Sequence, residues 1–136
     1  MKFIAFAAVL SLSAGAAAAQ TPVSEPVGTY ARTLSGQEIL APQGPLQVTV
    51  TRTTIPAGGQ LPPHKHPYAR YALILEGAVK VTNLVTGTVS VVKAGEFSIE
   101  SRDQWHKGEA MDGKPAVLLV IDQTPPGEAN LVRMAP

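Results

Sequence analysis

The stretch at residues 58–77 reads GGQLPPHKHPYARYALILEG and contains His64 and His66, two of the chain's three histidines. On an extended segment, side chains two residues apart project to the same face, so both imidazoles can reach one point. A compact β-barrel can bring His106 to the same interior point, where three neutral imidazoles on one cation form a common metal site. The alternative is a rigid exposed loop, since an H-x-H pair is by itself a weak signal.

Around this stretch the sequence is a series of short strand-like segments. Residues 47–55, QVTVTRTTI, alternate and are rich in β-branched residues, and residues 117–122 form a buried-type apolar run. Further segments lie at 71–75, 78–84, 88–92 and 96–99. Turn residues separate the segments, which follow one another at a spacing of about ten residues, and this is typical of an all-β sandwich or barrel.

The N-terminal segment differs in composition from the rest. Residues 1–19 contain a single charged residue, Lys2, followed by an apolar run and by a series of small residues that ends before Gln20. This pattern predicts a Sec-type signal peptide cleaved after Ala19, and hence a periplasmic or secreted protein. The alternatives are an N-terminal helix or an uncleaved anchor, although the apolar run is too short to span a bilayer.

The remaining chain suits one domain. We expect an N-terminal arm at 20–33, a β-barrel at 34–123 and a loop-like C-terminal tail at 124–136. Without Lys2, Lys+Arg falls from 11 to 10 and matches the 10 Asp+Glu, so the mature domain is formally neutral. A neutral chain without a basic run gives no signal for nucleic acid or for an anionic membrane. The absence of cysteine excludes disulfides and thiolate chemistry.

The two histidine regions resemble the two motifs of the cupin superfamily. The first motif is a glycine, five residues, H-x-H, three or four residues, a glutamate, six residues and a glycine. The positions in register with it are Gly58, His64, His66 and Gly77. In the second motif a glycine turn leads to a third histidine, matched by Gly95 and His106. Its Pro-x-Gly is replaced at residues 101–103, and its asparagine by Ala110.

The resemblance implies a single jelly-roll β-barrel with His64, His66 and His106 as metal ligands. The departure is Arg70, which stands where the family has its glutamate ligand. Two explanations stay open: a three-histidine site with Arg70 turned toward a substrate carboxylate, or a binding pocket that has lost its metal. Three glutamates could supply the missing carboxylate. We expect the first to be a turn residue and the other two to be solvated: Glu76, Glu100 and Glu109.

Four residues are candidates for substrate binding. Arg70 can pair bidentately with a carboxylate, although a structural ion pair is the alternative. Tyr68 shares the parity of the histidines on a regular strand, whereas Tyr71 is expected to pack on the opposite face. Gln60 precedes the histidine segment, and Trp105 adjoins His106, where packing at the barrel mouth is its alternative role.

These features predict a small exported protein that binds a divalent metal and acts on or binds a small, anionic organic molecule. Zinc or copper is favoured for imidazole ligands loaded outside the cytoplasm, with nickel, manganese and iron as further candidates. The resemblance implies dioxygenase, isomerase or lyase chemistry, and the alternative is a non-catalytic ligand-binding or sensing protein of the envelope without a metal. It also suggests a homodimer formed through the arm at 20–26.

Overall fold

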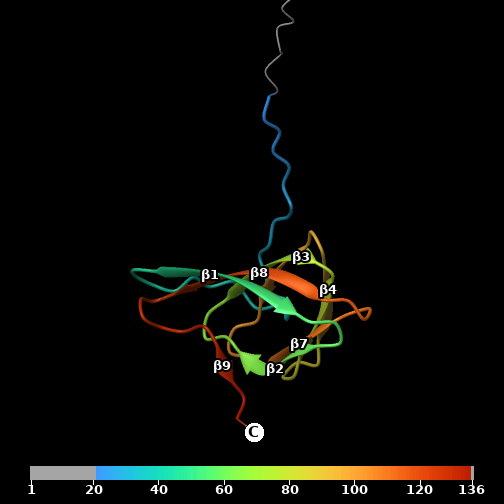
Figure 1. Cartoon of the computed structure of the whole chain (residues 1–136). Helices are drawn as coiled ribbons and strands as arrows, with labels where there is room; N and C mark the ends of the chain where they lie inside the picture. The colour runs from blue at the N-terminus through green and yellow to red at the C-terminus, as the bar shows by residue number, and fades with distance from the viewer. Residues whose placement is uncertain (1–20, 136) are drawn as a thin grey trace, which may run out of the picture.

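The computed structural model describes residues 21–135, which form two antiparallel sheets (Figure 1). The strands of this region are β1 (Gln47–Ile55), β2 (Gln60–Lys65), β3 (Arg70–Glu76), β4 (Ala78–Asn83), β5 (Val89–Lys93), β6 (Phe97–Glu100), β7 (His106–Ala110), β8 (Ala116–Thr124) and β9 (Val132–Arg133). One sheet has the order β1-β8-β3-β6 and the other β5-β4-β7-β2-β9. The all-β prediction is therefore confirmed. The predicted signal peptide at 1–19 lies outside the described residues.

The apolar core lies between the inner faces of the two sheets. The alternating side chains of β8 that face inward are buried, because strand residues two apart share a face. They pack against inward residues of β3 and β4 in one cluster of buried residues: Ile55, Ala72, Ile74, Val79, Val92, Ala116, Leu118 and Val120. Within residues 21–135, no helix is long and apolar enough to cross a membrane.

Gly77 shows why the first motif ends in glycine. It forms the turn between β3 and β4 with φ +71°, a left-handed conformation that side-chain-bearing residues rarely adopt. A Cβ at this position would also overlap the backbone carbonyl oxygen of Pro115. Both constraints fix the tight turn that carries the chain from one sheet to the other.

The segment before β1 covers one end of the barrel. Leu34 donates its backbone N–H to the carbonyl of Ile99 at 2.8 Å. The Gln37 side chain makes two hydrogen bonds with the backbone of Arg102, at 2.9 and 3.0 Å. Residues 21–29, by contrast, run away from the two sheets as an exposed chain without strand pairing, and Tyr30 is the first residue to pack against a strand, through the ring of Phe97 (Figure 1).

The C-terminal segment returns to the histidine strand. It is irregular over most of its length, but β9 pairs with β2 in the register His64–Arg133 and Lys65–Val132. Met134 extends the contact by donating its N–H to the carbonyl of Pro63 at 3.1 Å. Residues of the segment predicted as a loop-like tail therefore lie beside the strand that carries His64.

Candidate metal centre

Strand register places the candidate ligands on two facing rows. Across the five-stranded sheet, Asn83 is opposite His106, His106 is opposite His64, and His64 is opposite Arg133. Directly opposite residues of antiparallel strands point to the same face. The other sheet carries a second such row, in which Arg70 lies between Asp122 and Glu100.

A β-bulge sets the direction of the first histidine. Leu61 is opposite Gly108 and His64 is opposite His106, so β2 has one residue more than β7 between these pairs. Pro62 and Pro63 occupy the interval and cannot donate to the ladder. Bulges of this kind turn a strand and re-aim its side chains, often next to functional sites. The two prolines thus help to direct His64 inward.

Four side chains converge at one buried point. The potential ligand atoms of His64, His66, Glu100 and His106 all lie within 4.8 Å of one another. The three histidines are 0–5% exposed, and the side chain of Glu100 is 12% exposed. Their imidazole centroids are only 4.5–4.9 Å apart. The structure thus brings the three predicted histidines together and adds a carboxylate to them.

Backbone carbonyls fix the orientation of every imidazole. His64 Nδ1 lies 2.7 Å from the carbonyl oxygen of Pro62, and His66 Nδ1 lies 2.6 Å from that of Asn130. His106 Nδ1 is 2.8 Å from the carbonyl oxygen of Gln104. Because a carbonyl can only accept, each Nδ1 carries the proton, and each Nε2 of a neutral ring is left with a lone pair. Such contacts are the usual way to orient a metal-binding histidine.

Glu100 completes a set of acceptors that face one another. Its Oε2 lies 2.8 Å from His66 Nε2 and 3.2 Å from His106 Nε2. With neutral rings, three nitrogen lone pairs and a carboxylate oxygen share this point without a hydrogen between them. Only protons on the rings or a cation can relieve that arrangement. One carboxylate and three imidazoles form a donor set that fits a divalent transition metal.

The pKa values show how protons are distributed without a metal. Burial lowers the pKa of His64 to about 4, so this ring is neutral at physiological pH. Burial also opposes ionisation of Glu100, but hydrogen bonds from His106 and His66 outweigh it and hold the pKa of the carboxyl well below its usual range. For His106, burial is outweighed by the hydrogen bond and charge of Glu100, which raise its pKa. The cluster can therefore hold a proton as an ion pair.

Arg70 does not take the place of a ligand. Its Nε and Nη2 donate to the two carboxylate oxygens of Asp122, at 2.9 and 2.7 Å. Asn130 donates to the same carboxylate at 2.6 Å and accepts the N–H of Tyr68 at 2.8 Å. Asn130 thus links the Arg70–Asp122 pair to His66, because its own carbonyl holds that ring.

Of the three alternative glutamates, only Glu100 reaches the cluster, and the expectation that it is solvated is wrong. It lies directly opposite Arg70 on the neighbouring strand. Glu76 is exposed beside Arg52, and Glu109 pairs with Lys80 at 3.0 Å. A glutamate at the end of the predicted 96–99 strand, six residues before His106, was the available sequence signal for this ligand.

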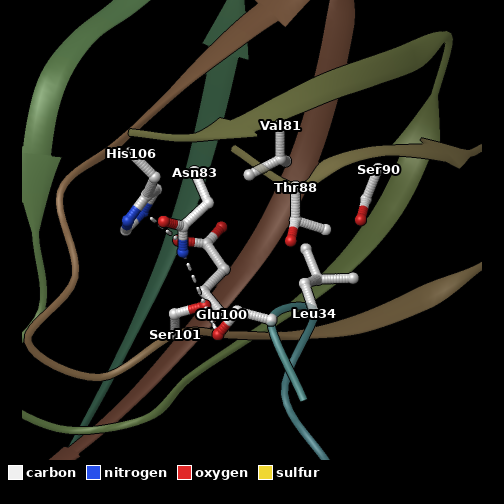
Figure 2. Close-up of a pocket in the computed structure, with 9 residues that line it drawn as sticks. Leu34, Val81, Asn83, Thr88, Ser90, Glu100, Ser101 and His106 are labelled. Atoms are coloured by element: carbon white, nitrogen blue, oxygen red, sulfur yellow. Dashed lines mark hydrogen bonds and ion pairs between the residues drawn. The ribbon is translucent and has the colours of Figure 1, made fainter. Parts of the chain in front are cut away.

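A cavity of about 320 Å³ opens onto His64 and Glu100. Its remaining walls come from β1, β2, β3, β8 and the C-terminal segment: Thr51, Thr53, Leu61, Pro62, Arg70, Leu118, Val120, Leu131 and Arg133. A second cavity of about 10 Å³, enough for one water molecule, adjoins His106 and Glu100 from the side of Leu34 and the hydroxyls of Thr88, Ser90 and Ser101 (Figure 2).

Only one of the four predicted substrate-binding residues lines the large cavity, namely Arg70. Tyr68 donates its hydroxyl to Glu128 at 2.6 Å. Gln60 is exposed at the start of β2. Trp105 is partly buried and packs under the ammonium of Lys65, 5.4 Å from its ring. Tyr71 packs with Phe97, as expected for a residue on the opposite face.

Comparison with known proteins agrees with this architecture. The sequence profile of the family described as "Cupin domain" matches residues 51–122. A recombinant oxalate oxidase in complex with glycolate shares 26% identity at a TM-score of 0.52, over 63% of this chain and 45% of its own. An uncharacterized conserved protein with a double-stranded β-helix domain from Klebsiella pneumoniae shares 21% sequence identity at a TM-score of 0.52, over 62% of this chain and 72% of its own. The polyketide cyclase RemF from Streptomyces resistomycificus shares 22% sequence identity at a TM-score of 0.54, over 65% of this chain and 62% of its own.

The chain spans less than half the length of the oxalate oxidase chains that it matches. No curated protein matches the sequence. The solved structures agree with the jelly-roll prediction, and the family profile covers more than half of the 136 residues. On this evidence the chain belongs to the cupin family.

Proposed function

We propose that this cupin binds a divalent transition metal through His64, His66, Glu100 and His106 and acts on a small organic anion in the adjoining cavity. The observation that carries the proposal is the meeting of four acceptor atoms at one buried point, with each imidazole held through Nδ1. Buried acceptors without a donor are costly unless a cation or a proton satisfies them.

Zinc or copper is the favoured occupant. Three imidazoles and one carboxylate are ligands that both metals accept, and the Irving–Williams order favours copper, nickel and zinc over iron and manganese. The order applies because we propose that residues 1–19 direct export and that the metal is loaded outside the cytoplasm. Nickel, manganese and iron remain candidates under other loading conditions.

The cavity supplies the features that a small anionic ligand needs. When bound, the metal would act as a Lewis acid that polarises an oxygen of the ligand. Leu118 and Val120 provide an apolar wall that excludes water, while Thr51 and Thr53 can hydrogen-bond the ligand. The oxalate oxidase structure contains glycolate, a small hydroxy acid, which supports a ligand of this class. Dioxygenase, isomerase and lyase reactions are the candidate chemistries.

Metal analysis of the purified protein tests this proposal. We expect about one equivalent of zinc or copper and a higher melting temperature after loading than after chelation. His106→Ala should lose both effects, whereas Lys107→Ala, its partly exposed neighbour on β7, should keep both. Failure of the wild-type protein to bind any divalent metal would refute the proposal.

The same geometry favours one second candidate, a metal-free binding protein. His66 and His106 both contact Glu100, and protonated rings would satisfy its carboxylate as ion pairs. In this case the cavity binds a ligand without catalysis, in keeping with the predicted envelope sensor. A wild-type protein that binds small anions equally well with and without divalent metal would favour this candidate.

A further inference from the structure

Arg133 lies on the cavity side of the C-terminal segment. Its strand, β9, pairs with β2 so that Arg133 is directly opposite His64. Opposite residues share a face of the sheet, so Arg133 lies on the same face as His64, in an exposed position on the edge strand. Arg133 accordingly lines the cavity that opens onto His64 and Glu100.

The cavity contains two arginines, and only one of them is neutralised. Arg70 is bound bidentately by Asp122, so this pair contributes no net charge. None of the ion pairs formed within residues 21–135 includes Arg133. With a divalent metal bound, the charges are +2 from the metal, −1 from Glu100 and +1 from Arg133, which sum to +2.

A small dianion would balance this charge. A guanidinium binds a carboxylate through two parallel hydrogen bonds. The volume of about 320 Å³ is at the small end of the range for ligand pockets and admits a short diacid.

We propose that Arg133 is the anchor for a carboxylate of the ligand, and that this cupin prefers small dicarboxylates over monocarboxylates. One carboxylate lies at the metal end of the cavity, near His64 and Glu100, and the other binds Arg133 at the mouth. This inference rests on the proposed function, because it takes the metal as the second positive centre.

Titration calorimetry with malonate, succinate and acetate tests the inference on the metal-loaded protein. We expect the wild-type protein to bind one of the two diacids more tightly than acetate. Arg133→Gln should weaken diacid binding by about 10- to 100-fold, as expected for lost charge-assisted hydrogen bonds, and should leave acetate binding nearly unchanged. Arg133→Lys should recover part of the affinity, because lysine keeps the charge but lacks the bidentate fork.

Arg52→Gln is the matched control, since Arg52 is an exposed arginine of β1 that pairs with Glu76 and does not line the cavity. Metal content is measured before and after each titration, so stripping of the metal by a diacid is detected. A loaded wild-type protein that binds neither diacid better than acetate, or an Arg133→Gln variant with wild-type diacid affinity, would overturn the inference. A wild-type protein that takes up no metal fails the proposed function instead, and that failure appears in the metal content alone.

Discussion

Replacing Glu100 with glutamine removes the only anionic member of the proposed ligand set. The substitution keeps the shape of the side chain, whose Oε2 lies 2.8 Å from His66 Nε2 and 3.2 Å from His106 Nε2. A neutral amide oxygen is a much weaker ligand for a divalent cation than a carboxylate. We therefore expect Glu100→Gln to fold and to retain three imidazole donors, but to bind metal weakly.

The size of the effect follows from simple linkage. Loss of a partner that only orients a ligand typically costs about 10- to 100-fold in affinity, so loss of the charged ligand should cost at least about 100-fold. With free metal at about 1,000 times the wild-type Kd, binding stabilises the fold by about 4.1 kcal/mol. A 100-fold weaker Kd leaves about 1.4 kcal/mol, and the difference of about 2.7 kcal/mol corresponds to about 10 °C in Tm for a domain of this size.

The assay is thermal unfolding of each protein with and without metal, so that each variant is compared with its own metal-free form. Glu109→Gln is the control, because Glu109 pairs with Lys80 outside the cluster. The control should show the full metal-induced rise in Tm. A rise of the same size in Glu100→Gln would show that the carboxylate does not bind the metal, and the four-ligand reasoning would be wrong.

Three further predictions concern the fold, the support of the site and its pH dependence. Gly77→Ala should lower the free energy of unfolding by about 2–5 kcal/mol, because of left-handed backbone strain and overlap with the carbonyl of Pro115. Gly113→Ala, at a position with φ +63° and open space around it, should lower it by only about 1–2 kcal/mol. Chemical denaturation of both variants measures the difference. Asn130→Ala should lower the free energy of unfolding by about 2–4 kcal/mol, since the Tyr68 N–H and the buried Asp122 carboxylate each lose a hydrogen bond. It should also weaken metal binding about tenfold, as measured by competition with a chelator. The contact with the Glu100 carboxylate outweighs burial and raises the pKa of His106, so metal affinity should fall as the pH drops through that pKa. Below that pKa, metal binding should release about one proton, which calorimetry in buffers of different ionisation enthalpy measures. A metal affinity that does not depend on pH would contradict this prediction.

The sequence predicts those parts of the site that depend on local spacing. His64 and His66 share a face because they are two residues apart on an extended segment, and Gly77 marks a turn that only glycine can form without strain. The sequence names Glu100 as one of three glutamates that could supply a carboxylate, but the choice among the three depends on the pairing of Glu100 with Arg70 on the neighbouring strand, which sequence spacing alone does not give. Asn130 was missed for the same reason, because its three hydrogen bonds reach back into residues 66–68 and 122 from a segment that looks like a loop.

The exchange of glutamate for arginine at position 70 becomes understandable when the whole row is considered. Asp122, Arg70 and Glu100 lie side by side, with charges of −1, +1 and −1 that sum to −1. A glutamate at position 70 between two neutral neighbours would give this row the same net charge of −1. Asp122 neutralises the arginine on one side, while Glu100 supplies a carboxylate to the histidines on the other. Restoring glutamate at position 70 alone would place three carboxylates in one row, so the arginine and its two acidic neighbours are best regarded as a single unit.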